Sequence, residues 1–199
     1  TKQKRRHTPM SITIEKVLET IEADDVGKVD QYIPTKSLHM DEDGKLTFGT
    51  HGQMRLTEYA TTQAFTKLGI PTRFGKKLMQ ERPDIIADTW NHFAQQDDRT
   101  SLVRMKDFGE YGEVRGILSD EYSILDNNSV RRTLEMLHEK FKDRISLHSF
   151  HIDDHRMHIR IIFDFMKKQV GFLPNGGDDI VELGTDLINS EVGASSMLV

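Results

Sequence analysis

Residues 156–164 read Arg-Met-His-Ile-Arg-Ile-Ile-Phe-Asp, and this stretch decides how the C-terminal half of the chain folds. Apolar side chains recur at positions 157, 159, 161 and 163, a period of two that is typical of a strand with one buried face. The positions between them place Arg156, His158 and Arg160 on the opposite face. The stretch therefore predicts a half-buried strand with one apolar and one basic face.

Further strands are predicted on both sides of this stretch. Residues 145–152 form a second strand, which a short acidic turn joins to the first as a hairpin. Beyond a turn-rich loop at 173–179, two more strands are expected near 180–188 and 195–199. The sequence stops inside the last of these, on an apolar run, so we expect it to lack the end of its domain.

The first half of the chain is dominated by helices between residues 57 and 96. Thr57 and Gly69 bound one predicted helix, while Pro71 and Pro83 suit the first turns of two more. The remaining predicted elements are helices near 14–21 and 127–141 and strands near 32–40, 45–48, 102–106 and 113–118. The acidic turn at 41–44 lacks the alternating ligands and distal glutamate of a calcium loop, so no calcium is expected there.

Together these elements predict an α+β fold, in which a helical block packs on a mainly antiparallel, meandering sheet. We expect residues 11–199 to form a single α+β domain. Residues 1–10 precede it as a basic, flexible tail with Lys2, Lys4, Arg5 and Arg6.

The composition is that of a globular protein and excludes several classes of site. The 199 residues include 27 Lys+Arg and 32 Asp+Glu, a net charge of −5, and 36% are hydrophobic. No apolar run approaches the roughly 20 residues of a membrane-spanning helix, so no membrane partner is expected. The absence of cysteine excludes disulfides, zinc–thiolate sites and thiol nucleophiles, and it fits a reducing interior.

The net negative charge leaves room for a local basic surface. Residues 1–100 carry as many basic as acidic side chains, so the acidic excess lies in the second half. Basic residues also concentrate between Arg55 and Arg82, opposed there by only two glutamates. Because salt confines each charge to roughly 8–10 Å, such a patch can act independently of the total.

Several segments, taken in order, resemble one known family. They are Leu56-Thr-Glu-Tyr-Ala60, Leu68-Gly-Ile-Pro71, Val114-Arg-Gly-Ile-Leu-Ser-Asp-Glu-Tyr122, Leu125-Asp-Asn127 and Asn189-Ser-Glu-Val-Gly193. The family is that of phage/plasmid-like proteins, known by the shared region called domain of unknown function 932. The resemblance implies a mobile-element protein in a bacterial cytoplasm, associated with replication or recombination. It implies no reaction and no catalytic residue.

Two motifs approach known sites without matching them. Residues 69–77 have five residues between the glycines of a phosphate-binding loop where four are needed, and Lys77 stands where Ser or Thr should hold magnesium. We interpret this segment as a connection between helices. Ser119-Asp-Glu-Tyr122 and Asn189-Ser-Glu191 combine a hydroxyl with carboxylates, but such residues also make the backbone hydrogen bonds of turns, which is the interpretation we favour.

Rows of cations suggest a nucleic-acid surface, because basic side chains at strand spacing can follow a phosphate backbone. We predict a non-catalytic protein without a cofactor that binds single-stranded DNA in replication or recombination. Phe150, Tyr111 or Tyr122 could stack on bases. The predicted nucleic-acid-binding residues are Arg73, Lys76, Lys77, Arg131, Arg132, Arg156, His158 and Arg160.

Two alternatives stay open from the sequence. His148, His151, His155 and His158 surround one hairpin, which permits a divalent-metal-dependent nuclease or another phosphodiester enzyme, although their spacing selects no metal geometry. A structural phage assembly protein is the other alternative. An unpaired strand at a sheet edge also predicts a homo-oligomer, with a closed ring as one arrangement.

Overall fold

The computed structural model describes residues 12–107, 111–174 and 176–194. The expected flexible tail at 1–10 and the expected last strand at 195–199 lie outside these residues. Helices and strands are both abundant, so the predicted α+β class is confirmed. The elements are α1 (Ile14–Asp25), β1 (Lys28–Pro34), β2 (His39–Met40), β3 (Leu46–Phe48), β4 (His51–Leu56), α2 (Glu58–Lys67), α3 (Thr72–Glu81), α4 (Pro83–Ala94), β5 (Thr100–Asp107), β6 (Gly112–Ser119), α5 (Asn127–Phe141), β7 (Ile145–Ile152), β8 (Met157–Phe172) and β9 (Asp178–Asn189).

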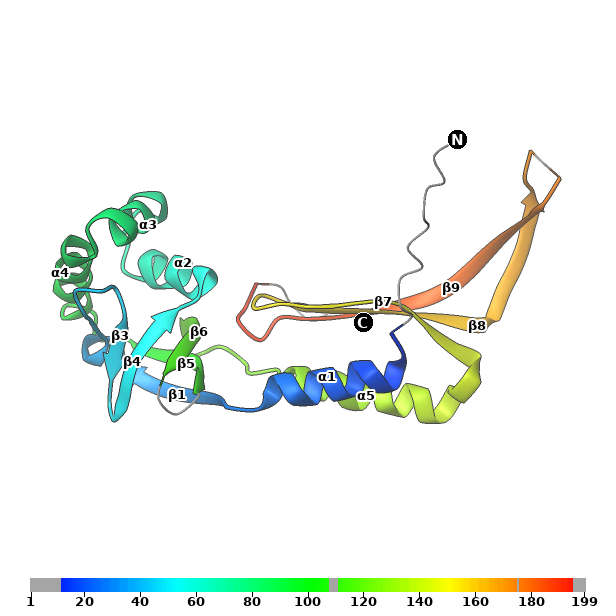
Figure 1. Cartoon of the computed structure of the whole chain (residues 1–199), viewed down its shortest axis with the longest axis horizontal. Coiled ribbons are helices and arrows are strands. Elements are labelled where there is room, and N and C mark those ends of the chain that lie inside the picture. Colours follow the sequence, from blue (N-terminus) through cyan, green and yellow to red (C-terminus); the bar gives the residue numbers. More distant parts are fainter. Residues whose placement is uncertain (1–11, 108–110, 175, 195–199) are drawn as a thin grey trace, which may run out of the picture.

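The described chain forms an elongated molecule with two lobes (Figure 1). The six-stranded lobe holds the sheet β1-β5-β6-β4-β3-β2 and the helices α2, α3 and α4. The three-stranded lobe holds the sheet β7-β8-β9 together with α1 and α5, which run side by side beneath it. The chain crosses between the lobes from α1 into β1 and again from β6 into α5.

The pairing of the described strands is mainly antiparallel, as expected, but the expectation of one meandering sheet is wrong. There are two sheets, and the larger one is mixed, because β4 pairs with β6 in parallel through Arg55 and Glu113. A long connection between β4 and β6 makes the parallel pair possible. It contains α2, α3, α4 and β5, and after it β6 runs beside β4 in the same direction. β4 itself was not predicted.

Each lobe has its own apolar core. In the six-stranded lobe, Trp90, Phe65 and Met105 are fully buried between the helices and one face of the sheet. This confirms the predicted helical block. In the three-stranded lobe, Val17 of α1 and Leu134 of α5 pack against Met157, Ile159 and Ile161 of β8, which confirms the alternation predicted for this strand. One face of each sheet is thus left for polar side chains.

No helix in the described part of the chain combines the length and the apolar character needed to cross a membrane.

Candidate nucleic-acid interface

The structure divides the eight predicted nucleic-acid-binding residues among three places. Arg73, Lys76 and Lys77 lie on α3, Arg131 and Arg132 lie on α5, and the other three lie on or beside β8. Because α5 packs on the apolar face of the sheet, the cations of β8 lie on the opposite face. The eight residues therefore do not form one continuous surface.

The row of cations on β8 is balanced by the neighbouring strand. Arg160 pairs with Asp186 of β9 in the sheet register and donates to its carboxylate from Nε and Nη2, at 2.7 and 2.8 Å. The hydrogen bonds from Arg160 lower the pKa of Asp186 to about 2. His158 lies 3.4 Å from the same carboxylate. Arg156, in contrast, makes no side-chain hydrogen bond or ion pair within the described residues.

The histidine-rich hairpin does not assemble a metal site. Among the described residues, no three His, Asp or Glu side chains gather as metal ligands would. His151 instead binds Asp153 at 2.8 Å, and Asp153 accepts the backbone N–H groups of His155 and Arg156 in the turn. Burial raises the pKa of Asp153, but these hydrogen bonds outweigh it and lower the pKa to about 2. The cluster thus closes a turn between β7 and β8.

The helical cations are partly paired as well. Lys76 lies 3.0 Å from Glu58, and Arg131 lies 2.9 Å from Glu135. Gly75, which directly precedes Lys76 and Lys77, is buried against the ring of Phe65. The segment therefore packs two helices together, as the sequence analysis favoured.

A cationic surface that sequence reasoning missed lies on the face of the six-stranded sheet opposite α2, α3 and α4. We call it the open face. Residues that alternate with the apolar core positions of β1, β3, β4, β5 and β6 project there, as the register shows for the pairs Arg104–Asp30 and Arg55–Glu113. The cations of the open face and its rim are Lys28, Lys45, Arg55, Arg104, Lys106 and Arg115.

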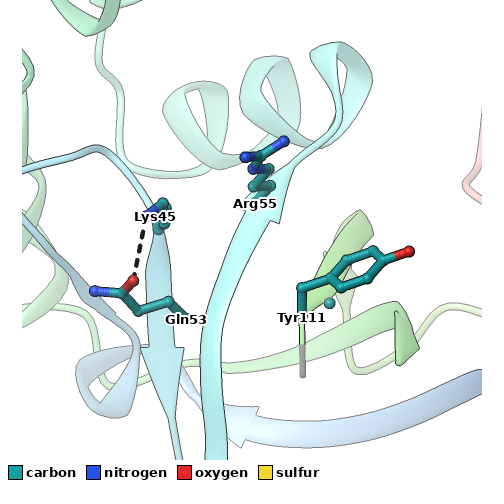
Figure 2. Close-up of a pocket in the computed structure, with 5 residues that line it drawn as sticks. Lys45, Gln53, Arg55 and Tyr111 are labelled. Atoms are coloured by element: carbon teal, nitrogen blue, oxygen red, sulfur yellow. Dashed lines mark hydrogen bonds between the residues drawn. The ribbon is translucent and has the colours of Figure 1, made fainter. Parts of the chain in front are cut away.

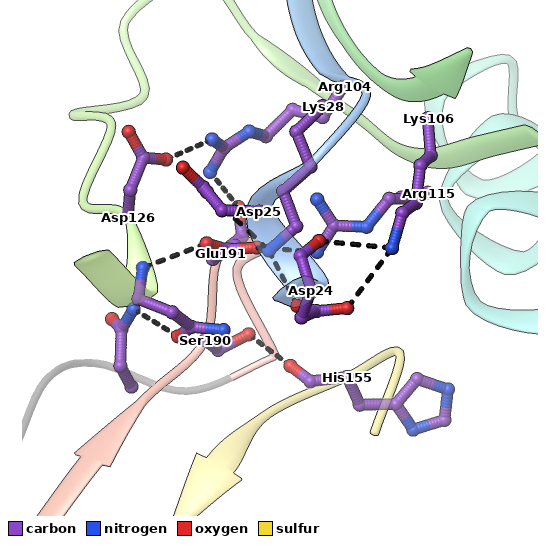
Figure 3. Close-up of polar contacts among 12 residues, drawn as sticks. Asp24, Asp25, Lys28, Arg104, Lys106, Arg115, Asp126, His155, Ser190 and Glu191 are labelled. Carbon is purple, nitrogen blue, oxygen red and sulfur yellow. Dashed lines mark hydrogen bonds and ion pairs between the residues drawn. The ribbon is translucent and has the colours of Figure 1, made fainter. Parts of the chain in front are cut away.

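The inner half of the open face is covered by acidic groups of the three-stranded lobe (Figure 3). Glu191, 1% exposed, accepts from Lys28 at 2.8 Å, from Arg115, and from the backbone N–H of Asn127 at 2.8 Å. Burial raises the pKa of Glu191, but the nearby positive charges of Lys28 and Arg115 outweigh it and keep the pKa below its usual range. We call this set of contacts the junction.

Arg104 is the second anchor of the junction. Its guanidinium is 2% exposed and donates to Asp30 at 2.8 and 2.9 Å, to Asp126, and to the backbone carbonyl of Glu191 at 2.6 Å. Lys106 donates to Asp24 at the end of α1. The cations of the inner half therefore form ion pairs and hydrogen bonds that hold the two lobes together.

The segment around Glu191 has a structural role throughout. Asn189 donates to the carbonyl of Leu125 at 3.0 Å, and Ser190 donates to the carbonyl of His155 at 2.6 Å. Both residues are buried. Tyr122 donates to the carbonyl of Ser190 at 3.0 Å. Its pKa is raised, chiefly by burial.

The outer half of the open face remains accessible and is hollowed by a pocket of about 510 Å³. Its lining consists of Lys45, Gln53, Arg55, Tyr111 and Gly112, and Figure 2 shows the labelled side chains around the ends of β3, β4 and β6. Lys45 donates to Gln53 at 3.2 Å and to the exposed carboxylate of Asp43 at 3.4 Å, whereas Arg55 makes no hydrogen bond or ion pair within the described residues. The pocket thus combines two cations, an amide and an aromatic ring.

Glu113 borders this pocket as the register partner of Arg55. Its pKa is raised, first by burial and then by the negative charge of Asp154, against the lowering effect of Arg115, Lys106 and Arg55. The turn between β7 and β8 lies beside the six-stranded lobe, because the ring of His155 in that turn lies 5.1 Å from the ring of Tyr59 on α2.

Comparisons with protein-family models, with curated proteins and with solved structures found no match. The geometry of the open face therefore carries the functional argument.

Proposed function

We propose that this protein binds single-stranded nucleic acid, without catalysis, through the outer half of the open face. The observation that carries the proposal is the pocket itself. It presents the guanidinium of Arg55, which makes no hydrogen bond or ion pair within the described residues, next to Lys45 and the exposed ring of Tyr111. The inner half of the same face shows that this arrangement of cations attracts carboxylates, since Glu191 and the aspartates already occupy it.

Each lining group has a role in such binding. Arg55 and Lys45 attract backbone phosphates, and the release of counterions on contact supplies affinity without regard to sequence. A tyrosine ring offers a face on which an unpaired base can stack, and this contributes about 1–3 kcal/mol per base. Gln53 carries an amide that can hydrogen-bond to a base edge. Unpaired bases are needed for stacking, so a single strand is favoured over a duplex.

The turn between β7 and β8 extends the proposed path. Arg156 lies in this turn, has a guanidinium without an ion pair in the described residues, and follows Asp154, which acts on Glu113 at the pocket edge. A single-stranded nucleic acid that leaves the pocket in this direction would meet Arg156 before Arg160. The charge of Arg160 is already balanced by Asp186. We therefore assign phosphate contacts to Arg55, Lys45 and Arg156.

We further propose, from the resemblance to phage/plasmid-like proteins, that the protein acts in DNA replication or recombination in a bacterial cytoplasm. The alternative of a metal-dependent nuclease lacks geometric support, because the histidines of the hairpin do not converge in the described residues. Among the described residues that line the pocket there is also no carboxylate pair that could hold a catalytic metal ion.

Fluorescence anisotropy with a labelled single-stranded oligonucleotide tests the proposal. Affinity should fall as salt rises, and the log–log slope should decrease by roughly 0.7 for each phosphate contact removed. Lys45→Gln with Arg55→Gln should reduce both affinity and slope. Lys36→Gln is the matched control, because Lys36 is an exposed lysine that pairs with Asp98 at 3.2 Å.

Two results would overturn the proposal. One is an affinity for the oligonucleotide that is absent or independent of salt in the unmodified protein. The other is a double variant that binds with the affinity and slope of the Lys36→Gln control.

A further inference from the structure

The hairpin of β8 and β9 continues well beyond the rest of its sheet (Figure 1). The last residue pair between β7 and β8 is Ile145 with Phe163, so residues 164–172 of β8 pair with β9 alone. The described residues of 164–184 are called the arm. In the described structure both edges of the arm are unpaired, since β9 is the outer strand of the sheet.

The arm exposes an unusual concentration of apolar side chains. Eight of the eighteen large apolar residues that are exposed in the described chain lie on this tenth of the sequence, and Phe172 is 75% exposed. Only its base is packed, where Phe165 stacks on Phe141 of α5 at 5.5 Å. The eight residues are Phe165, Met166, Val170, Phe172, Leu173, Ile180, Val181 and Leu183.

An isolated two-stranded ribbon is at best marginally stable in water, and long apolar edges pair readily with other strands. The exposed arm therefore lacks a third strand or a covering layer. The charges on the two strands of the arm indicate which molecule can supply the missing strand.

The two strands of the arm carry opposite charges. Lys168 on β8 makes no ion pair within the described residues, and neither does Asp179 on β9. Lys167 is already bound, at 3.2 Å to Asp164 and at 2.8 Å to Glu182. The β9 strand of the arm has three acidic residues and no basic one. Its edge therefore repels a copy of itself and attracts the lysine-bearing edge of β8.

We propose that the arm docks a second copy of this chain, with the free edge of β8 in one copy pairing with the free edge of β9 in the next. The pairing extends the order β8-β9 from copy to copy and buries apolar side chains of both arms. Because the two contacting edges differ, the interface is head-to-tail, and repetition produces a closed ring or a filament. Pairing of β9 with β9 is disfavoured by comparison, since it would place acidic groups together.

This inference goes beyond nucleic-acid binding and does not depend on it. The pocket of the six-stranded lobe contributes no residue to the arm, so association should occur without any oligonucleotide. A failure of either proposal therefore leaves the other standing.

Charge reversal at the two edges tests the direction of the contact. Sedimentation velocity across a concentration series should show oligomers for the unmodified full chain without nucleic acid. Lys168→Glu and Asp179→Lys should each weaken association by about three- to tenfold, the effect of cross-strand charge pairs. An equal mixture of the two variants should restore it, because every contact in an alternating assembly then joins opposite charges.

A second variant tests the arm as a whole. Replacing residues 166–181 by Asn-Gly closes a short hairpin and removes most of the exposed apolar side chains. This variant should sediment as a monomer while its circular dichroism and thermal transition show that both lobes remain folded.

A monomeric unmodified chain at every concentration would overturn the proposal. So would oligomers that persist in the arm-shortened variant, since another surface would then hold the copies together. Binding of the arm to lipid vesicles or to another protein, with the chain itself monomeric, would equally assign the surface to a different occupant.

Discussion

The ammonium group of Lys28 lies 2.8 Å from the carboxylate of Glu191, and the two side chains are 8% and 1% exposed. Lys28 begins β1 in the six-stranded lobe, whereas Glu191 follows the last strand of the three-stranded lobe. This ion pair, together with Arg115, joins distant parts of the chain across the junction. The orientation of the two lobes therefore depends on a few desolvated charges.

Removing the charge of Glu191 should destabilise the protein strongly. In Glu191→Gln, Arg115 stays buried and loses the one carboxylate it pairs with among the described residues, while Lys28 keeps only Asp24 and Asp25 at the end of α1. Breaking a buried pair in this way costs about 3–5 kcal/mol. The shape of the side chain and its hydrogen bond from the backbone of Asn127 are retained. Urea unfolding followed by circular dichroism measures the change in the free energy of unfolding.

Glu19→Gln is the matched control for this variant. Glu19 pairs with Lys16 at 3.0 Å, but both side chains are 67% exposed. Its removal should change the free energy of unfolding by no more than about 0.5 kcal/mol. Equal effects of the two substitutions would contradict the structural role assigned to Glu191.

The junction should also make stability depend on acid pH. The pKa of Glu191 in the folded protein lies below its ordinary value of 4.5, so the unfolded chain binds a proton more readily than the folded one. Its contribution is therefore complete above about pH 4.5 and is lost as the pH falls through the lowered pKa. Asp24 contributes to stability with the same pH dependence. Burial raises its pKa, but the hydrogen bonds and positive charges of Lys28 and Lys106 outweigh this effect and lower the pKa.

Urea titrations at several pH values between 7 and 3 measure this dependence. The free energy of unfolding should fall toward acid pH more steeply in the unmodified protein than in Glu191→Gln, which lacks the titrating group. Parallel curves for the two proteins would show that Glu191 is not the group responsible.

The sequence predicted the elements of the fold better than their assembly. The three helices between 57 and 96 are found almost at their expected bounds, because proline, glycine and a Thr57 side chain that accepts from Ala60 mark their ends locally. The parallel pairing of β4 with β6 depends on contacts between residues far apart in the chain. Local periodicity carries no information about such pairing.

The candidate site shows the same limit. The face of Arg160 was predicted correctly from its period of two, but its partner Asp186 is set by the register of β9. Arg55 was noted only as part of a basic stretch, since nothing local reveals that β4 presents it beside Tyr111. Glu191 was assigned to a turn, although its side chain, 1% exposed, is bound by Lys28 of β1, Arg115 of β6 and the backbone N–H of Asn127 of α5. Whether a charged side chain is paired depends on residues that only the tertiary structure brings beside it.

A single methyl group at Gly75 should destabilise the six-stranded lobe. A Cβ built at this position would lie 2.7 Å from the ring of Phe65, which is fully buried and cannot move aside freely. Overpacking of this kind typically costs about 1–3 kcal/mol. Alanine favours a helix over glycine by only about 1 kcal/mol, so Gly75→Ala should be less stable despite its better helix propensity.

Gln80→Ala serves as the comparison for this variant, because Gln80 is an exposed residue of the same helix. Thermal unfolding should show a lower midpoint for Gly75→Ala and little change for Gln80→Ala. A midpoint for Gly75→Ala at or above that of the unmodified protein would show that α3 shifts away from Phe65 at no cost.

Two arginines on strands should differ in their effect on single-stranded DNA binding because only one of them has a partner. The guanidinium of Arg160 is held by both oxygens of Asp186, whereas Arg55 has no ion pair within the described residues. Removing Arg55 deletes a charge available to phosphate, while removing Arg160 deletes one that is already balanced. Arg55→Gln should therefore lower the salt slope by roughly 0.7, and Arg160→Gln should leave it nearly unchanged.

Anisotropy titrations at several salt concentrations give both slopes, and Asp186→Asn completes the comparison. If Asp186 is what keeps Arg160 from binding phosphate, its neutralisation should increase affinity and steepen the slope, since Arg160 and His158 would then lack an anion. The double variant Arg160→Gln with Asp186→Asn should lose most of that gain. A larger loss from Arg160→Gln than from Arg55→Gln would instead move the interface from the six-stranded sheet to β8, because it would show that DNA competes successfully with the carboxylate of Asp186.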